Sequence, residues 1–141
     1  MTERATTTAN RPVRWGVTML RAAVASVFII HGLARTMLGT VGGFGEYLSG
    51  SGFPAGAAIA WTVTIVEIVG GIALGLGLLV RPLTLWFGVQ IATGIVMIHG
   101  PAGWFVVGHG RNGAEYSALI IACLVVVALT DTVSYRPALK R

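Results

Sequence analysis

The sequence predicts an all-α fold, an integral membrane four-helix bundle. Of its 141 residues, 55% are hydrophobic and only 11% are charged, whereas a soluble domain carries roughly 25% charged residues. The apolar residues also form long blocks, and about 20 consecutive apolar residues make a helix that crosses a bilayer core. These blocks do not show the alternation of membrane β-strands, so helices are favoured.

Four spans are predicted, at about residues 15–38, 56–80, 83–98 and 114–130, within one domain of residues 15–134. The first block follows a basic start, as in a secretory signal. It continues through His31-Gly32, beyond the end of a short signal core, so we interpret it as a retained span.

The chain ends and the connections between spans are polar or rich in glycine and proline. Residues 1–14 are expected to be a disordered cytoplasmic tail, and residues 135–141 a basic cytoplasmic tail. Residues 39–55 are expected to form a loop with a short interfacial segment. Arg81-Pro82 is expected to end the second span, because proline lacks an amide donor and disfavours helix in the residue before it. A second glycine-rich loop is predicted from His99 to Gly113.

The distribution of basic residues predicts the orientation. Of the 10 Lys and Arg residues, only Arg35 and Arg111 lie toward one side, and the remaining eight (10 − 2) lie on the other. By the positive-inside rule, the eight mark the cytoplasm. We therefore expect a multi-pass protein of the inner (plasma) membrane with both termini in the cytoplasm and both glycine-rich loops outside.

Composition also excludes several classes of function. The net charge of +5 is typical of nucleic-acid binding, but the basic residues flank apolar blocks and form no soluble patch. A single cysteine, Cys123, cannot build a disulfide framework, a CxxC pair or a cysteine zinc site.

In the second span, Gly71 and Gly75 form a small-xxx-small pair, which favours close packing of helices in lipid.

The ionisable residues of the spans are the candidate ligand or proton-relay groups. His31 and Arg35 are one turn apart on one face of the first span, and Glu67 lies near the middle of the second. A charge at mid-bilayer costs about 2.5–3.5 kcal/mol, so Glu67 needs a partner, a proton or water. Arg35 is the best partner, because its long side chain can reach toward Glu67. The pair either handles protons or ligands, or only pins two helices together.

Two further candidates border the second loop. His99 ends the third span and Glu115 begins the fourth, where Glu115 also complements the positive end of a helix. His31 and His99 are a conceivable metal or haem pair, but no third ligand stands at suitable spacing, so no metal site is expected. Hydrogen bonding of these histidines to Glu67, Glu115 or a ligand carbonyl is favoured.

The order and spacing of several short motifs resemble the pattern of a known family. The motifs are Arg21 with His31-Gly32-x-x-Arg35, Gly52-Phe53-Pro54, Glu67-x-x-Gly70-Gly71 with Gly75-x-Gly77 and Arg81, and Glu115-Tyr116. The chain resembles the DoxX family of small four-span bacterial membrane proteins over essentially its whole hydrophobic length. It departs from the family at Ala128–Asp131, which lacks the usual glycine-containing turn.

The resemblance implies a membrane subunit associated with quinone- or thiol-linked redox chemistry, with His31, Arg35, Glu67 and Glu115 as the polar site. It leaves open whether the chain is an enzyme. The alternatives are a small transporter and a structural or assembly protein without catalytic activity. The expected partners are the lipid bilayer, a membrane redox enzyme and further copies of the chain, and nucleic acid is not expected. A quinone is the expected cofactor, with none attached covalently.

Overall fold

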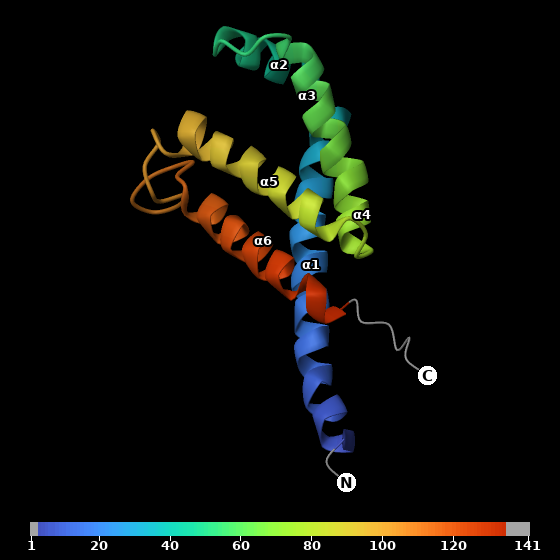
Figure 1. Ribbon diagram of the computed structural model, residues 1–141. Coiled ribbons are helices and arrows are strands. Elements are labelled where there is room, and N and C mark those ends of the chain that lie inside the picture. The colour runs from blue at the N-terminus through green and yellow to red at the C-terminus, as the bar shows by residue number, and fades with distance from the viewer. Residues whose placement is uncertain (1–2, 135–141) are drawn as a thin grey trace. The chain divides into compact units, whose positions relative to one another are not determined.

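The protein is helical throughout its regular structure. The computed structural model describes the backbone of residues 3–134 and the side chains of residues 11–131, and no strand occurs in that part of the chain (Figure 1). The elements in chain order are α1 (Glu3–Met37), α2 (Val41–Gly50), α3 (Gly56–Ile65), the π-helical segment η1 (Val66–Gly70), α4 (Gly71–Gly75), α5 (Val80–Gly94), the π-helical segment η2 (Ile95–His99) and α6 (Glu115–Ser134).

The helices confirm the all-α membrane fold class. Within the described residues, three helical stretches are long and apolar enough to cross a bilayer, namely Arg11–Met37, Gly56–Gly75 and Val80–His99. They correspond to the first three predicted spans. The fourth predicted span, at 114–130, coincides with the 20-residue helix α6, and its passage through the membrane stays a prediction.

The chain divides into two compact units, of which the first comprises residues 22–78. In this unit, α1 and the α3–η1–α4 helix run antiparallel and approach each other at glycines. A Cβ atom on Gly32 would meet Thr64 and Ile68, and a Cβ on Gly71 would lie 2.7 Å from Ile29 Cγ1. The predicted packing role is therefore confirmed for Gly71. Glycine permits this close approach, which strengthens van der Waals packing between helices in lipid.

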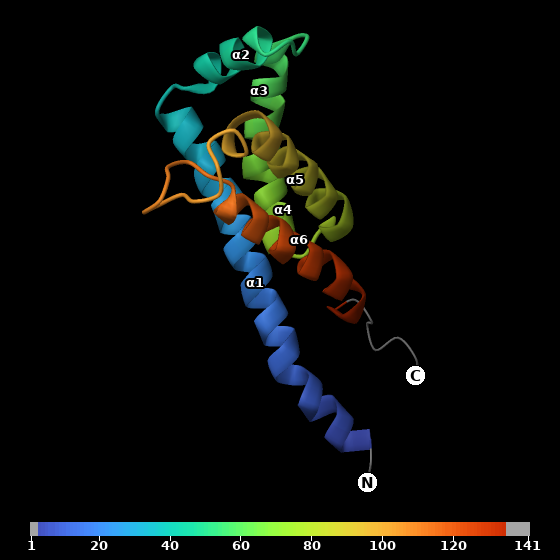
Figure 2. The same cartoon turned by 90° about the vertical axis from the view of Figure 1, so that its left-hand side faces the viewer.

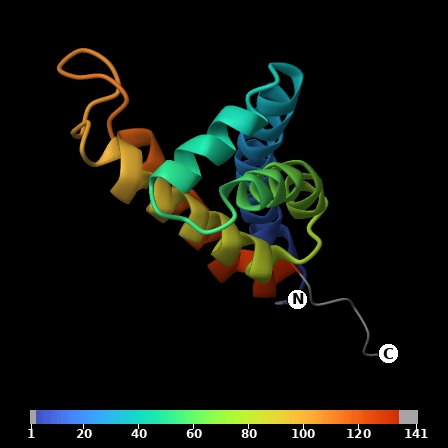
Figure 3. The ribbon, with the colours of Figure 1, turned by 90° about the horizontal axis from the view of Figure 1, so that it is seen from above.

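Helix α2 links α1 to α3 in the same unit, and Figure 3 shows this connection from above. The sequence placed residues 39–55 in a loop, but ten of them form α2. Gly45 of α2 and Gly56 of α3 lie where the backbones of these two helices touch. A Cβ on Gly45 would lie 2.8 Å from Ala57 Cα, and one on Gly56 would collide with the Gly45 carbonyl and with Ser49. Gly45 and Gly56 therefore serve for contact between helices, whereas a Cβ on Gly42, Gly43 or Gly50 would meet nothing within 4 Å.

The second unit comprises residues 1–21 and 79–141. Its helices α5 and α6 pack against each other and are joined by the loop that follows η2 (Figure 2). Hydrogen bonds close this loop, because the amides of Gly113, Ala114 and Glu115 donate to the carbonyls of Phe105, Gly103 and Trp104.

Two predicted boundaries are wrong. Helix α1 begins at Glu3, so residues 3–14, expected to be disordered, are helical. The helix continues through Pro12, which lacks an amide donor, so one hydrogen bond of the helix is missing there. Residues 135–141, the predicted basic tail, lie outside the described part of the chain.

The second wrong boundary concerns the break between the second and third spans. The predicted break at Arg81-Pro82 is instead a turn that ends at Leu79, with positive φ at Gly77 (79°) and Leu79 (49°). Pro82 is the third residue of α5. The first amides of a helix have no partner within it, so proline costs little there.

Candidate functional site

The described residues contain one deeply buried carboxylate, that of Glu67, and it lies on the packed face of the second membrane helix. Buried positions recur along this helix with the spacing of one helical face, at Ala60, Thr64, Glu67, Gly71 and Leu74. Exposed apolar residues such as Ile65 and Ile72 mark the opposite, lipid-facing side. The helix therefore holds its one acidic side chain away from lipid.

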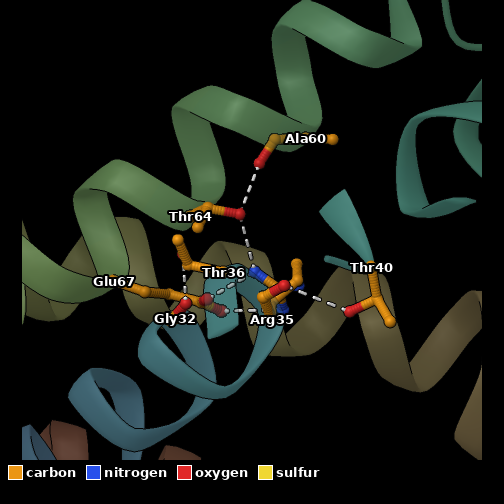
Figure 4. Close-up of polar contacts among 7 residues, drawn as sticks. All are labelled: Gly32, Arg35, Thr36, Thr40, Ala60, Thr64 and Glu67. Atoms are coloured by element: carbon orange, nitrogen blue, oxygen red, sulfur yellow. Dashed lines mark hydrogen bonds and ion pairs between the residues drawn. The ribbon is translucent and has the colours of Figure 1, made fainter. Parts of the chain in front are cut away.

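Arg35 of α1 is the partner of Glu67, as predicted (Figure 4). Arg35 Nη1 lies 2.6 Å from Glu67 Oε2, and Arg35 Nη2 lies 3.5 Å from Glu67 Oε1. The Arg35 side chain is 18% exposed and that of Glu67 only 3%. Removing one member of a buried pair leaves an uncompensated charge, so the two residues stabilise each other in this apolar setting.

Two contacts of the pair were not predicted from the sequence. Thr64 Oγ1 accepts a hydrogen bond from Arg35 Nη1 at 3.1 Å and donates one to the carbonyl of Ala60 at 2.7 Å. The ring of Phe44, from α2, lies with its centroid 4.8 Å from Arg35 Cζ. Thr64 precedes Glu67 by three residues and shares its helix face, which was an available signal. No sequence spacing indicated Phe44, because it comes from a different helix.

The local backbone supports the pair. Gly32 lies one turn before Arg35, and a Cβ there would be 3.0 Å from the Thr64 carbonyl oxygen and 3.1 Å from Glu67 Cβ. Glu67 lies in η1, a single π-helical segment inside an otherwise α-helical span. Such segments occur often at functional sites. The motif Gly32-x-x-Arg35 thus combines close helix contact with a cation one turn later.

His31 is not part of this cluster. Its side chain is exposed on α1, and within the described residues it makes no hydrogen bond. The predicted bond from His31 to Glu67 is therefore not formed in this structure. An exposed histidine on an apolar helix remains accessible to a ligand or a partner.

His99 and Glu115 belong to the other unit and bind the loop between η2 and α6. His99 Nδ1 donates to the carbonyl of Asn112 at 2.8 Å, and Glu115 Oε1 accepts from the amide of Val106 at 3.0 Å. Within the described residues, His99 does not bond to Glu67 or Glu115, the carboxylates predicted as its partners, and its bond to a ligand carbonyl stays a prediction. A carbonyl brought close by the loop supplies the acceptor instead.

The described residues contain no group of three or more His, Cys, Asp or Glu side chains able to hold a metal ion. The cluster of Arg35, Glu67 and Thr64 instead offers hydrogen-bond donors, a carboxylate and a hydroxyl in an apolar setting. This chemistry suits an uncharged ligand with an oxygen acceptor, or the movement of a proton.

The DoxX family model matches residues 16–100, which include Arg35, Glu67, Thr64 and Phe44. A Bacillus subtilis (strain 168) protein named "Putative oxidoreductase CatD" is 25% identical over 125 residues, which cover 87% of this chain and 84% of that protein. No solved structure matches the chain.

Proposed function

The chain belongs to the DoxX family, and on this premise we propose that it is a membrane subunit of a quinone- or thiol-linked redox system. The Arg35–Glu67 pair is its ligand-binding and proton-handling site. Electrons come from a partner enzyme in the membrane or from a diffusing donor. The Bacillus subtilis relative bears the name of an oxidoreductase, and this supports a redox role.

The burial of Glu67 is the observation that carries the proposal. Its side chain is 3% exposed within a stretch apolar enough to span the bilayer. An ionisable group inside a bilayer costs free energy of insertion. We therefore take a buried one as an indication of a ligand or proton pathway. A structural pin between helices needs no acid and base, because small residues already allow close packing in lipid.

The chemistry of the site fits the reduction of a quinone. A quinone takes up two electrons and two protons to become a quinol, and the new O–H bonds form at its two ring oxygens. In the proposal, Arg35 donates a hydrogen bond to one ring oxygen, the carboxylic acid form of Glu67 delivers one proton to that oxygen, and water supplies the second proton to the other ring oxygen. The electrons enter from the partner, and Glu67 then recovers its proton from water.

The test begins with the protein purified from its native membranes in nanodiscs. Mass spectrometry of co-purified proteins and extraction of quinones are performed on the wild type, Glu67→Gln and Glu46→Gln. Glu46 is the matched control, because it is an exposed glutamate of α2 in the same unit. We expect quinone or a redox enzyme to accompany the wild type and Glu46→Gln. Glu67→Gln should retain less quinone per mole of folded protein than Glu46→Gln, measured on preparations adjusted to the same protein concentration.

A wild-type preparation that retains neither a quinone nor a redox enzyme would contradict the proposal. An architectural role is then the second candidate, and a specific observation favours it. Gly32 and Gly71 hold α1 against the α3–η1–α4 helix in the turns that adjoin the ion pair. In that case, a double variant Arg35→Gln and Glu67→Gln should keep both the fold and the cellular phenotype.

We also propose the inner membrane as the location, with both termini in the cytoplasm. The count of basic residues supports this orientation.

A further inference from the structure

A groove runs along the contact between α5 and α6, within the second unit, where these helices lie side by side (Figure 1). Its volume is about 380 Å³, and the side chains that line it are almost all apolar. The buried Thr84 and Leu124 lie at its floor. The exposed Leu85, Val89 and Val125 form its rims. Because both helices are apolar and these rims are exposed, the groove opens to the lipid hydrocarbon.

Gly88 keeps the groove open. It lies in the lining of the groove, and a Cβ atom on it would meet nothing within 4 Å. Gly88 therefore differs from Gly71, whose missing side chain permits contact between two helices. The small residues Ala92 and Ala128 also line the groove. Small side chains on both helices thus leave a hollow where larger ones would fill the space.

The length of the groove matches one leaflet of a bilayer. On α5 its lining extends from Arg81 to Ala92, which is 11 residue steps (92 − 81) and about 16 Å at about 1.5 Å per residue. The hydrocarbon core is about 30 Å thick, so one leaflet contributes about 15 Å. A helix of this length, about 10–12 Å wide, occupies more than about 1,000 Å³. A groove of about 380 Å³ therefore fits a single acyl chain and is too narrow to enclose a helix.

Arg81 supplies a positive charge at one end of the groove. Its side chain is 62% exposed, and its Nε lies 3.9 Å from Asp131 Oδ2, beyond the usual hydrogen-bond range of about 2.7–3.2 Å. Such a long and exposed ion pair contributes little. Within the residues that the structure describes, the guanidinium of Arg81 makes no hydrogen bond. Its N–H groups therefore remain available, and a guanidinium binds phosphate oxygens through two parallel hydrogen bonds.

The backbone favours an anion at the same end. Arg81 is the second residue of α5, and Leu79, which precedes this helix, makes no capping hydrogen bond through its side chain. The positive end of the helix dipole therefore lies beside the guanidinium. An acyl chain that follows the groove would bring its headgroup to this point.

We propose that the groove between α5 and α6 binds an acyl chain of an anionic phospholipid and that Arg81 binds the phosphate of that lipid. On the proposed orientation, Arg81 lies on the cytoplasmic side, so the lipid belongs to the cytoplasmic leaflet. Basic pockets between membrane helices on this side bind anionic headgroups in other proteins. The site lies in the second unit and does not depend on the function proposed for Arg35 and Glu67.

Native mass spectrometry of the full chain in mild detergent tests the headgroup. The probes are phosphatidylglycerol and phosphatidylcholine with identical acyl chains, since the choline cation cancels the charge of its phosphate. We expect the wild type to bind phosphatidylglycerol about 5-fold more tightly, the equivalent of about 1 kcal/mol. Arg81→Gln should lose this preference. Arg14→Gln is the matched control, because Arg14 is exposed on α1 and predicted on the same side of the membrane, and it should keep the preference.

Gly88→Leu tests the groove, because a leucine at this position fills it. This variant should lose binding of both lipids. Gly16→Leu is its control, because a Cβ on Gly16 likewise meets nothing within 4 Å and lies outside the groove. If Gly88→Leu does not fold, Ala92→Leu fills the same groove. If Arg81→Gln does not fold, Arg81→Lys replaces it and should weaken the preference, since lysine lacks the paired donors of arginine.

Three results would overturn the proposal. The first is equal binding of the two lipids by the wild type, and the second is an unchanged preference in Arg81→Gln. The third is equal lipid binding by Gly88→Leu and Gly16→Leu. A wild-type dimer that Gly88→Leu dissociates would also overturn it, because the groove would then be an interface between two copies of the chain.

Discussion

Gly32 and Thr64 bring the backbones of two membrane helices into contact one turn from the Arg35–Glu67 pair. A Cβ on Gly32 would lie 3.0 Å from the Thr64 carbonyl oxygen and 2.7 Å from Ile68 Cγ1. The carbonyl belongs to the backbone and cannot rotate away. The close helix contact that Gly32 permits therefore allows Arg35 Nη1 to approach Glu67 Oε2 to 2.6 Å.

Gly32→Ala should lower the free energy of unfolding by about 1–3 kcal/mol, the usual cost of added volume in a packed interior. Gly16→Ala is the matched control in the same helix, because a Cβ there meets nothing within 4 Å. It should be neutral or stabilise by up to about 1 kcal/mol. Thermal unfolding in detergent measures both, and equal shifts for the two variants would refute the close contact at Gly32.

Glu67→Gln and Arg35→Gln should each destabilise the protein by about 3–5 kcal/mol, because each leaves one buried charge without its partner. The double variant should cost less than the sum of the two single changes. A double-mutant cycle of unfolding free energies gives the coupling. Additive single effects would show that the two side chains do not stabilise each other, and Glu46→Gln should change stability by less than about 0.5 kcal/mol.

Thr64→Val should cost about 1.5–3 kcal/mol, because it removes the hydroxyl that accepts a hydrogen bond from charged Arg35 while keeping the side-chain shape. Thr62→Val is the control two residues earlier, since that exposed hydroxyl bonds only to the carbonyl of Ala58. It should have little effect. If the two valine variants unfold at the same temperature, the hydrogen bond to Arg35 contributes nothing.

Glu115→Ala should loosen the loop between η2 and α6. The variant removes the acceptor for the Val106 amide, so hydrogen exchange at Val106 should accelerate. Glu115→Gln keeps an acceptor oxygen in the same place and should preserve most of the protection. Unchanged exchange in Glu115→Ala would mean that the backbone bonds of the loop suffice without this carboxylate.

The proposed orientation predicts which positions react with a membrane-impermeant maleimide. In a Cys123→Ser background, Ala102→Cys should be labelled on intact spheroplasts. Val13→Cys should be labelled only after the membrane is permeabilised. The opposite pattern would place both termini outside.

Much of the site could be predicted, because a charged side chain buried in lipid needs a partner of opposite charge and few such partners are within reach. Glu67 lies inside an apolar block, and Arg35 was the basic side chain best placed to reach it. His99 and Glu115 were harder to place, since their partners are backbone groups of a loop whose path no periodicity encodes. The turn at Gly77–Leu79 was missed because Pro82 was assigned to the break rather than to the first turn of α5.

The sequence by itself determined the all-helical membrane class, the main spans and the pairing of Arg35 with Glu67. These follow from the free energy of transfer into lipid, which depends on composition and on the spacing of residues along one helix. Only the tertiary structure decided that Thr64 accepts a hydrogen bond from Arg35, that Arg35 lies over the ring of Phe44, and that Gly32 and Gly45 are contact points between helices. These contacts join segments distant in sequence, and their geometry arises from packing that no local pattern specifies.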